Sequence, residues 1–352
     1  MTEFKNILVV RSDRMGDLVL TTPALKALRK SFPSARISLW VDRSTQDLVN
    51  GVSFIDEVLA EDRSLGWRGY LHFLTMLRKR QFDLAIIYHT KRRTNATCFL
   101  AGIPVRLGYK NNKFGFLLNR PVLDERHFGK KHESEYCLDL LESIGVKGKD
   151  FAIEVAANRD ADIWAEKVFI KHGLLGKTVV ALHPDASCST RLWPTDSFAR
   201  LAERLVNECQ VTVLIIGAEN ARSAAQKIME KGNNNTVDLT GQTTLAQMVS
   251  VLRRSHLLVS NDSGPVHVGA AVGIPVISLF LRSQPGINSL RWRPLGSLSV
   301  LICNEKDEEI KLDREGQVVS GKFDSIGVDS VFKKACAILS MSPNQQKAAN
   351  RG

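Results

Sequence analysis

The sequence of 352 residues contains no Cys-x-x-Cys motif. Its six cysteines stand singly and far apart along the chain. Zinc sites and disulfide-stapled domains need closely spaced or paired cysteines, so this spacing argues against both. We therefore expect neither a zinc site nor a disulfide framework, and a protein of the reducing cytoplasm.

Long apolar runs are also absent. The longest candidate, residues Val266–Phe280, is shorter than the 18 or more residues of a membrane span and contains two glycines and a proline. The first residues, Met1–Asn6, are polar, and the apolar run after them ends at Arg11, too early for a signal-peptide core. We expect neither a membrane-spanning helix nor a targeting segment, which leaves peripheral contact as the route to a membrane.

Two groups of recognition motifs are missing as well. No Gly-x-Gly-x-x-Gly motif follows the first strand of either half, which disfavours a dinucleotide-dependent oxidoreductase. Nothing resembles an RNA-binding aromatic motif, a zinc finger or a basic leucine zipper, so no nucleic-acid partner is expected.

Basic charge is abundant and unevenly placed. The net charge at pH 7 is +11, and between Arg78 and Lys131 thirteen Lys or Arg residues accompany three acids. Such a stretch indicates an anionic partner, such as a phosphorylated lipid or a membrane surface. The alternative is a solvated basic face without a partner.

Short aliphatic runs alternate with amphipathic segments, and the pattern occurs twice. The first half has expected strands at Asn6–Arg11, Arg36–Val41 and Phe82–Tyr88, with a helix around Pro23–Phe32. The second half has expected strands at Lys177–His183, Val211–Gly217, Leu257–Asn261 and Pro275–Phe280, and helices at Asn158–His172, Thr195–Cys209, Gly264–Val272 and Val331–Leu339. Strands and helices that alternate in this way are typical of a parallel sheet with crossover helices.

The repeated pattern predicts an α/β protein of two Rossmann-like, doubly wound domains that face a central cleft. We place the N-terminal domain at residues 1–160, the C-terminal domain at residues 161–340, and a frayed tail at residues 341–352. Ligands of such sheets bind at the carboxyl ends of the strands, so the chemistry should lie in the loops that follow them.

A polar loop follows the first predicted strand. Within Arg11–Asp17, Gly16 permits an unusual backbone conformation, and Asp17 projects from the loop or the first helical turn. A carboxylate there could remove a proton from a hydroxyl group, and Asp13 is a weaker candidate for that role. The alternative is that Asp17 only caps the helix and balances its dipole. Thr22-Pro23 resembles a cap with a first-turn proline, so we expect the regular helix to start later or to be kinked.

A hydroxyl-rich loop, His183–Pro194, follows the first strand of the second half. The side chains of Ser187 and Thr190 can donate hydrogen bonds to phosphate oxygens, and Arg191 can neutralise the phosphate charge. The alternative is an ordinary polar connection between a strand and a helix.

The segment Ser260–His267 is the most specific of the three loops. A predicted strand ends near Asp262, Ser263 and Gly264 follow, and a helix then begins with free N–H groups suited to a pyrophosphate. His267, in the first turn of this helix, can hydrogen-bond the same phosphates. The alternative for a single histidine in a helix is packing.

Together these segments resemble the bacterial lipopolysaccharide heptosyltransferases, glycosyltransferase family 9. The motifs are Met15-Gly16-Asp17 with Thr22-Pro23-Ala24-Leu25, then His183-Pro184 to Trp193-Pro194, then Asn261-Asp-Ser-Gly-x-x-His267 with Ala270-Ala271-x-Gly273-x-Pro275. The resemblance runs from about Asn6 to Gly296. It implies an inverting, metal-independent transferase of the GT-B type that moves a heptose from ADP-heptose to the inner core of lipid A-linked saccharide. It implies no cofactor beyond the nucleotide-sugar co-substrate.

The resemblance also assigns roles to residues. Asp17 corresponds to the catalytic base, and Arg191 lies where the family usually has a lysine near the donor phosphates. The donor site would comprise Ser187, Thr190, Glu219, Asp262, Ser263, Gly264 and His267. The chain departs from the family at Asp185, where glycine is common, and at residues 281–285. Because these changes surround the donor, they bear on the sugar and the base rather than on the reaction type.

The anionic lipid A-core acceptor would place the protein at the inner face of the cytoplasmic membrane, in transient contact with its surface. We expect the acceptor to contact Asp13, Arg78, Lys79, Arg80, Lys91, Arg92 and Arg93. These cations could equally form a solvated rim. Three other functions stay open: a transferase that uses another nucleotide sugar, a nucleotide-sugar epimerase or hydrolase on the same fold, and a non-catalytic anion-binding protein.

Overall fold

The structure, a computed structural model, describes residues 4–282, 284–296, 298–303, 311–312, 318–320 and 326–341. The chain divides into two compact units, Met1–Ala156 and Ala157–Gly352. This division lies four residues before the predicted boundary at residue 160. Of the predicted tail, only Met341 belongs to the described residues.

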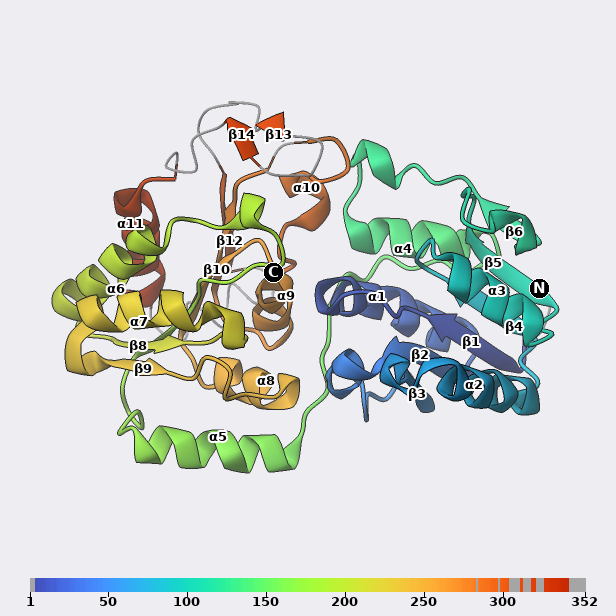
Figure 1. The fold of residues 1–352 in the computed structure, drawn as a ribbon, viewed down its shortest axis with the longest axis horizontal. Helices are drawn as coiled ribbons and strands as arrows, with labels where there is room; N and C mark the ends of the chain where they lie inside the picture. Colours follow the sequence, from blue (N-terminus) through green and yellow to red (C-terminus); the bar gives the residue numbers. More distant parts are fainter. Residues whose placement is uncertain are drawn as a thin grey trace. The chain divides into compact units, whose positions relative to one another are not determined.

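The N-terminal unit contains one parallel sheet of six strands. They are β1 (Asn6–Val10), β2 (Arg36–Asp42), β3 (Glu57–Glu61), β4 (Leu84–Ile87), β5 (Val105–Tyr109) and β6 (Arg120–Val122), in the order β3-β2-β1-β4-β5-β6. Its helices are α1 (Met15–Ser31), α2 (Gly66–Arg80), α3 (Arg92–Leu100) and α4 (Glu133–Glu142), with 3-10 turns η1 (Arg43–Leu48), η2 (Arg63–Leu65), η3 (Gly115–Leu117) and η4 (Arg126–Phe128) (Figure 1). The strand order reverses between β1 and β4, so this is the switch point of a doubly wound sheet.

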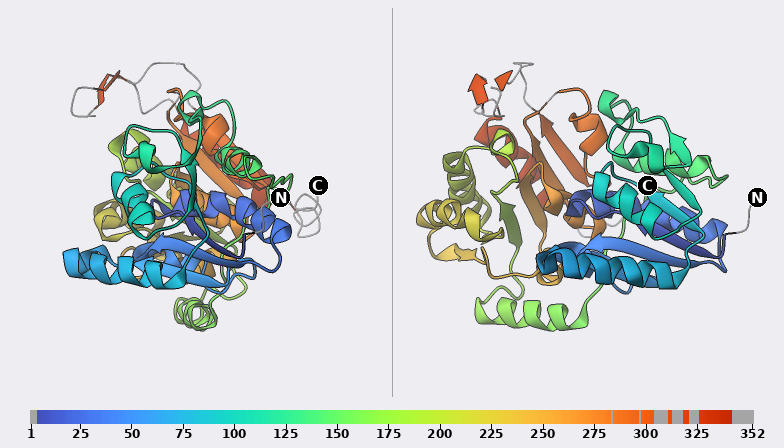
Figure 2. Two further views of the ribbon diagram at one scale, coloured as in Figure 1. Left: turned by 90° about the vertical axis from the view of Figure 1, so that its right-hand side faces the viewer. Right: turned by 45° about the vertical axis from the view of Figure 1, so that its right-hand side comes forward.

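Helices cover both faces of this sheet (Figure 2). Successive side chains of a strand point to opposite faces, so Leu8 and Val10 lie on one face of β1. They pack with Phe73 and Leu77 of α2 and with Cys98 of α3 in one buried cluster. Helix α1 packs against α4. Burial on both faces explains why the strands are continuously apolar.

The C-terminal unit repeats this architecture. Its parallel strands are β7 (Val179–His183), β8 (Thr212–Ile215), β9 (Thr236–Asp238), β10 (Leu257–Asn261), β11 (Val276–Phe280) and β12 (Ser299–Cys303), in the order β12-β11-β10-β7-β8-β9. The helices are α5 (Arg159–Lys171), α6 (Thr195–Cys209), α7 (Arg222–Gly232), α8 (Leu245–Arg253), α9 (Gly264–Ala271), α10 (Ser289–Trp292) and α11 (Val328–Leu339), with 3-10 turns η5 (Ser189–Arg191), η6 (Glu219–Ala221) and η7 (Asn233–Asn235). A two-stranded sheet pairs β13 (Lys311–Leu312) with β14 (Val318–Ser320). The switch point here lies between β7 and β10.

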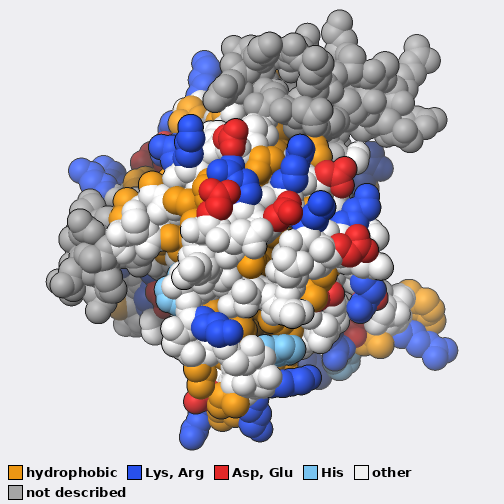
Figure 3. Space-filling view, turned by 90° about the vertical axis from the view of Figure 1, so that its left-hand side faces the viewer, with side chains coloured by type: hydrophobic (Ala, Val, Ile, Leu, Met, Phe, Trp, Pro, Cys, Tyr) orange, Lys and Arg blue, Asp and Glu red, His pale blue; other side chains and the backbone are white. Residues whose placement is uncertain are grey.

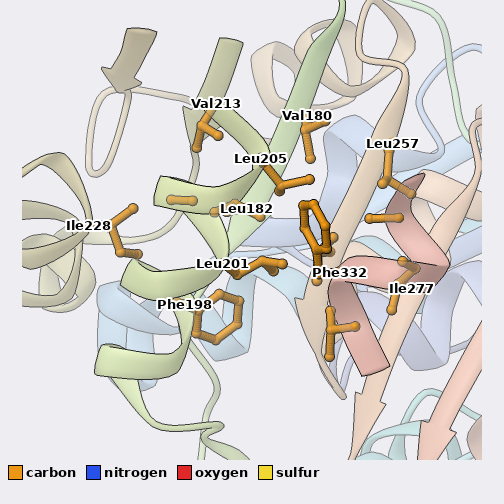
Figure 4. Close-up of a cluster of buried hydrophobic side chains, with 14 of the residues drawn as sticks. Val180, Leu182, Phe198, Leu201, Leu205, Val213, Ile228, Leu257, Ile277 and Phe332 are labelled. Carbon is orange, nitrogen blue, oxygen red and sulfur yellow. The ribbon is translucent and has the colours of Figure 1, made fainter. Parts of the chain in front are cut away.

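The core of the C-terminal unit joins α6 and α11 to the sheet. Leu201 and Leu205 of α6 lie four residues apart, on one helical face, and meet Val180 of β7 and Phe332 of α11 in a single buried cluster (Figure 4). Complete burial of each such side chain contributes about 1.5–3 kcal/mol. Trp193, also buried there, donates its Nε1–H to the carbonyl of Ile326 (2.8 Å) and so fixes the loop before α6.

Of the two alternatives predicted for Thr22-Pro23, a helix that starts later is wrong, because α1 begins at Met15 and Pro23 lies inside it; the alternative of a kinked helix stays a prediction. A proline cannot donate a hydrogen bond to the carbonyl four residues earlier, here that of Val19. The hydroxyl of Thr22 donates to that carbonyl instead (2.7 Å) and also accepts the backbone N–H of Glu154 (3.0 Å). Since Thr22 compensates for the missing bond, the helix continues through the proline.

Thr22→Val is therefore expected to lower the free energy of unfolding by about 2 kcal/mol, since it leaves two backbone groups without a partner in a buried place while keeping the side-chain volume. Urea unfolding followed by circular dichroism measures the change. Thr75→Val is the matched control, because the Thr75 hydroxyl also bonds a helical carbonyl but is exposed. Equal stability of Thr22→Val and the control would contradict this account of the proline.

Among the described helices, none combines the length and the apolar character that crossing a lipid bilayer requires.

Candidate active site

The switch point of the N-terminal unit gathers charged side chains from two neighbouring strands. The loop after β1 carries Asp13 and leads into Asp17 in the first turn of α1, and the chain after β4 carries His89 and Lys91. The Nζ atom of Lys91 donates to the carbonyl of Ser12 (3.2 Å), which ties the two loops together. Parallel strands end at the same edge of the sheet, and this brings residues 70 or more positions apart into one site.

A single buried guanidinium organises this site. Arg11 is 1% exposed, and its Nη2 lies 2.7 Å from Oδ1 of Asp17 and 2.8 Å from Oε1 of Glu133 on α4. Its Nε lies 3.2 Å from Oδ1 of Asp13, and its Nη1 donates to the carbonyl of Tyr88 (3.1 Å). The guanidinium of Arg11 thus contacts three carboxylates, from the loop after β1, the first turn of α1 and the start of α4.

The pKa values of the two candidate bases, Asp17 and Asp13, shift in opposite directions. Burial raises the pKa of Asp17 to about 7, and the negative charges of Asp13 and Glu133 add to the effect, while Arg11 opposes it. Burial also acts on Asp13, but the positive charges of Arg11 and Lys91 outweigh it, so the pKa of Asp13 falls below its ordinary value. A carboxylate with a pKa near 7 is the better proton acceptor at neutral pH, which favours Asp17 as the base.

His89 adds an uncharged polar group to the same edge. It is 6% exposed, and its Nε2 shares a hydrogen bond with the hydroxyl of Thr94 (2.9 Å). No atom of the described residues hydrogen-bonds its Nδ1. Burial lowers the pKa of His89 to about 3, so the ring is neutral.

The structure separates the predicted acceptor residues into two groups. Lys91, Arg92 and Arg93 follow β4 at the edge that carries Asp17, and Arg93 pairs with Glu61 at the end of β3. The other group, Arg78, Lys79 and Arg80, forms the last turn of α2 and lies at the opposite edge of the sheet. Arg80 there pairs with Glu57 at the start of β3 and accepts the side chain of Asn6 through its carbonyl. The structure does not bring this second group together with Asp17.

In the C-terminal unit, Asn261 joins the loops after β7 and β10. Its Nδ2 donates to the carbonyl of Pro184 (2.8 Å), and its Oδ1 accepts the backbone N–H of Trp193 (2.9 Å). The Nδ1 atom of His183 lies 3.2 Å from the hydroxyls of Ser260 and Ser263. The hydroxyl-rich loop and the helix start predicted from the sequence therefore form one site.

Two guanidiniums meet one carboxylate in this site. Nη1 of Arg191 donates to the carbonyl of Asp262 (3.2 Å) and lies 3.9 Å from its Oδ2, whereas Nη2 of Arg282 lies 2.7 Å from that Oδ2. Asp262 thus neutralises Arg282 more closely than Arg191. Guanidiniums can hold diphosphate oxygens through paired hydrogen bonds, so these two side chains are candidates for donor contact.

The start of α9 supplies backbone donors beside these cations. Ser263 is the N-cap and makes no capping bond with its side chain, and Gly264 and Pro265 open the helix. Pro265 has no N–H and that of Val266 donates to the carbonyl of Ser263 (3.2 Å), so the backbone N–H of Gly264 and the helix dipole are what favour an anion there. His267 is 3% exposed in the first turn, and a Cβ on Gly269 would lie 3.0 Å from Leu258 and 3.1 Å from Val276, so glycine lets the helix lie close to the sheet.

The remaining donor candidates differ in exposure. Ser187 is exposed, and Thr190 is buried with its hydroxyl 3.1 Å from the sulfur of Cys188, an exposed free thiol. This hydrogen bond lowers the pKa of Cys188. Glu219 follows β8, is exposed and pairs with Arg222.

Four residues of these sites were not predicted from the sequence: Arg11, His89, Glu133 and Arg282. Three of them follow strand ends, and a polar residue directly after a predicted strand is a usable signal. Glu133 comes from α4, far along the chain, and offered no such signal. Within the described ranges, no group of three or more His, Cys, Asp or Glu side chains is placed to hold a metal ion.

Two doubly wound units, each a parallel six-stranded sheet with its switch point at the carboxyl ends of the strands, have the two-domain α/β fold called GT-B. The chain belongs to glycosyltransferase family 9 (heptosyltransferase), whose family profile matches residues 70–319. The resemblance inferred from the sequence and the predicted fold class are thereby confirmed.

Individual relatives are distant in sequence but similar over nearly their whole length. The lipopolysaccharide core heptosyltransferase OpsX of Haemophilus influenzae is 22% identical over 306 residues, 85% of this chain and 84% of that protein. A family 9 glycosyltransferase from Veillonella parvula has a TM-score of 0.82 at 22% identity, covering 96% of this chain and 98% of that one. The ADP-heptose LPS heptosyltransferase II of E. coli has a TM-score of 0.77 at 22% identity, covering 95% and 98%. A more distant structure, at 13% identity and a TM-score of 0.58, is the iron-containing dodecameric glycosyltransferase TibC of E. coli.

Proposed function

We propose that this chain transfers a heptose from ADP-heptose to the inner core of lipopolysaccharide, with inversion at the anomeric carbon and without a metal ion. The observation that carries the proposal is the carboxylate of Asp17, 15% exposed and 2.7 Å from the guanidinium of Arg11, whose pKa of about 7 suits a base at neutral pH. Membership of family 9 and the heptosyltransferase relatives support the sugar and the acceptor.

In the proposed reaction, the N-terminal unit prepares the acceptor. Asp17 takes the proton of the acceptor hydroxyl as the oxygen attacks the anomeric carbon from the face opposite the diphosphate, which inverts the configuration. Arg11 keeps the carboxylate oriented through the 2.7 Å contact.

The C-terminal unit binds the donor and stabilises the leaving group. Negative charge grows on the ADP phosphates as the glycosidic bond breaks. That charge meets a preorganised arrangement of three groups: the side chain of Arg191, the backbone N–H of Gly264 and the side chain of His267. Such an arrangement is usually the largest catalytic contribution. These cationic and backbone donors are why we infer that no metal ion is needed.

The acceptor also suggests where the protein works. The inner core on lipid A carries phosphates and carboxylates and is anchored in a membrane. The basic side chains of Lys91 and Arg92 beside the N-terminal site suit such an acceptor. We propose a cytoplasmic protein in peripheral, transient contact with the inner face of the cytoplasmic membrane.

The test is mass spectrometry of a truncated lipid A-core acceptor incubated with the protein and ADP-heptose, with and without EDTA. We expect a mass gain of one heptose in both samples and the opposite anomeric configuration by NMR. A gain that EDTA abolishes would contradict metal independence alone. Consumption of donor without acceptor would favour an epimerase or hydrolase. No mass gain and no donor consumption with any of a panel of nucleotide sugars would favour an anion-binding protein.

The activity should depend on pH through Asp17. Because the base must be deprotonated, kcat/KM is expected to fall tenfold for each pH unit below about 7. Glu133→Gln removes a negative charge that raises the pKa of Asp17, so this acid limb should move about one unit lower. Glu142→Gln, on the exposed side of the same helix, is the control and should leave the profile unchanged. Identical profiles for all three proteins would contradict the role of the ionic cluster.

A further inference from the structure

We propose that the surface formed by α3 and η3 of the N-terminal unit docks on an anionic lipid bilayer. We call it the α3–η3 surface, and it consists of Arg92, Phe99, Leu100, Lys113, Phe114 and Phe116. This inference rests on the proposed function only in that the acceptor is held by a lipid. The docking itself requires no transfer reaction.

The surface exposes large apolar side chains at one place. Phe116 is 79% exposed, Phe99 49%, Leu100 44% and Phe114 40%. The rings of Phe114 and Phe116 lie 5.7 Å apart, between centroids. A soluble protein rarely gathers exposed apolar side chains in this way unless the patch binds something.

Cations join these rings into one surface. The guanidinium of Arg92 lies 5.8 Å from the ring centroid of Phe114. That of Arg106 lies 5.3 Å from the ring of Phe99, and its Nε donates to the carbonyl of Leu117 in η3 (2.7 Å). The helix and the turn are therefore linked at both ends of the patch.

The chain around this surface carries no acid. Between Asp83 and Asp124 the sequence has no Asp or Glu, but it has seven basic residues, namely Lys91, Arg92, Arg93, Arg106, Lys110, Lys113 and Arg120. Of these seven, only Arg93 forms an ion pair within the described part of the chain. By contrast, the face in Figure 3 shows acidic side chains among the basic ones over much of its area. Unpaired basic charge next to exposed aromatic rings is complementary to a bilayer with anionic headgroups.

The geometry favours a bilayer over a nucleic acid or a protein. Phe116 stands at the tip of a three-residue turn, where its ring can enter the headgroup region while Lys113 and Arg92 stay at the level of the phosphates. Helix α3 begins directly after Lys91. The Nζ atom of Lys91 donates to the carbonyl of Ser12, in the loop that carries Asp13. A membrane bound at this surface would hold a lipid-anchored acceptor close to the proposed base.

Sedimentation with vesicles tests the proposal. The full chain is mixed with vesicles of phosphatidylcholine alone or with 30% (about one lipid in three) phosphatidylglycerol. We expect binding only to the anionic vesicles, and a partition coefficient at least tenfold lower for Phe114→Ser/Phe116→Ser. Lys110→Gln/Lys113→Gln should weaken binding and reduce its dependence on salt. The control Ile163→Ser/Ile170→Ser removes two exposed apolar side chains of α5 and should bind as the unchanged protein does.

The outcomes separate this inference from the proposed function. Phe114→Ser/Phe116→Ser should keep its activity on a truncated, water-soluble acceptor, which also shows that it folds. Binding of this variant at the unchanged level, or equal binding to both vesicle types, would overturn the docking surface. Retention on single-stranded DNA with no preference for anionic vesicles would overturn it in favour of a nucleic acid. Vesicle binding without any transferase activity would leave the surface standing and refute only the proposed function.

Discussion

Asp17→Asn is expected to lower kcat about 10³-fold, within the range that a general base contributes, while KM for both substrates changes little. Asparagine has nearly the same shape and can still accept a hydrogen bond from Arg11, but it cannot take a proton. Because the pKa of Asp17 is raised in the folded protein, its ionised form does not stabilise the fold, and we expect Asp17→Asn to be no less stable. Initial rates of heptose transfer, followed by mass spectrometry, measure the effect.

Asp13→Asn is the matched control for this experiment. The two carboxylates share Arg11, but the pKa of Asp13 is lowered and that of Asp17 is raised, so Asp13 is the weaker proton acceptor. We expect Asp13→Asn to raise KM for the acceptor more than it lowers kcat. If Asp13→Asn reduced kcat more than Asp17→Asn did, the assignment of the base would have to be exchanged.

Arg191→Ala should have the second largest effect, a loss of kcat of about 10²–10³-fold, since the charge on the departing diphosphate would lose its main positive partner. Arg191→Lys should recover part of this loss, because an ammonium keeps the charge but not the two-pronged hydrogen bonding. Single-turnover rates with ADP-heptose separate this loss from weaker donor binding.

Arg282→Ala serves as the comparison. Arg282 is paired with Asp262 at 2.7 Å, so less of its charge is available to a diphosphate than that of Arg191, 3.9 Å from the same oxygen. We expect a smaller loss of kcat for Arg282→Ala than for Arg191→Ala. The reverse order would mean that Asp262 turns to Arg191 when the donor binds.

The fold was largely predictable from the apolar pattern, because parallel strands buried on both faces are short, continuous apolar runs. Strand Leu257–Asn261 and helix Thr195–Cys209 match the expectation residue for residue. Strand β3 (Glu57–Glu61) was not predicted, since it lies near the edge of the sheet and two of its five residues are acidic. The start of α1 was misjudged because a local rule for proline ignored the hydroxyl that compensates for it.

The candidate sites were less predictable than the fold. The loops after β1, β7 and β10 could be found because they follow strands at the switch points. The choice between Asp13 and Asp17 could not be made from sequence, because it depends on how Arg11 divides its charge and on Glu133, more than 100 residues away. From the sequence, Arg78 and Lys91 were both predicted to contact the acceptor. In the structure they lie at opposite ends of β4.

The thiol of Cys188 allows the loop His183–Pro194, the proposed donor loop, to be labelled chemically. It is exposed, its pKa is lowered by the hydrogen bond from Thr190, and it lies three residues before Arg191. Alkylating reagents react with thiolates, so among the cysteines this one should be modified early. A nucleotide bound beside Arg191 would slow that reaction. The rate of alkylation at this position thus becomes a readout of donor occupancy that needs no acceptor, no membrane and no turnover.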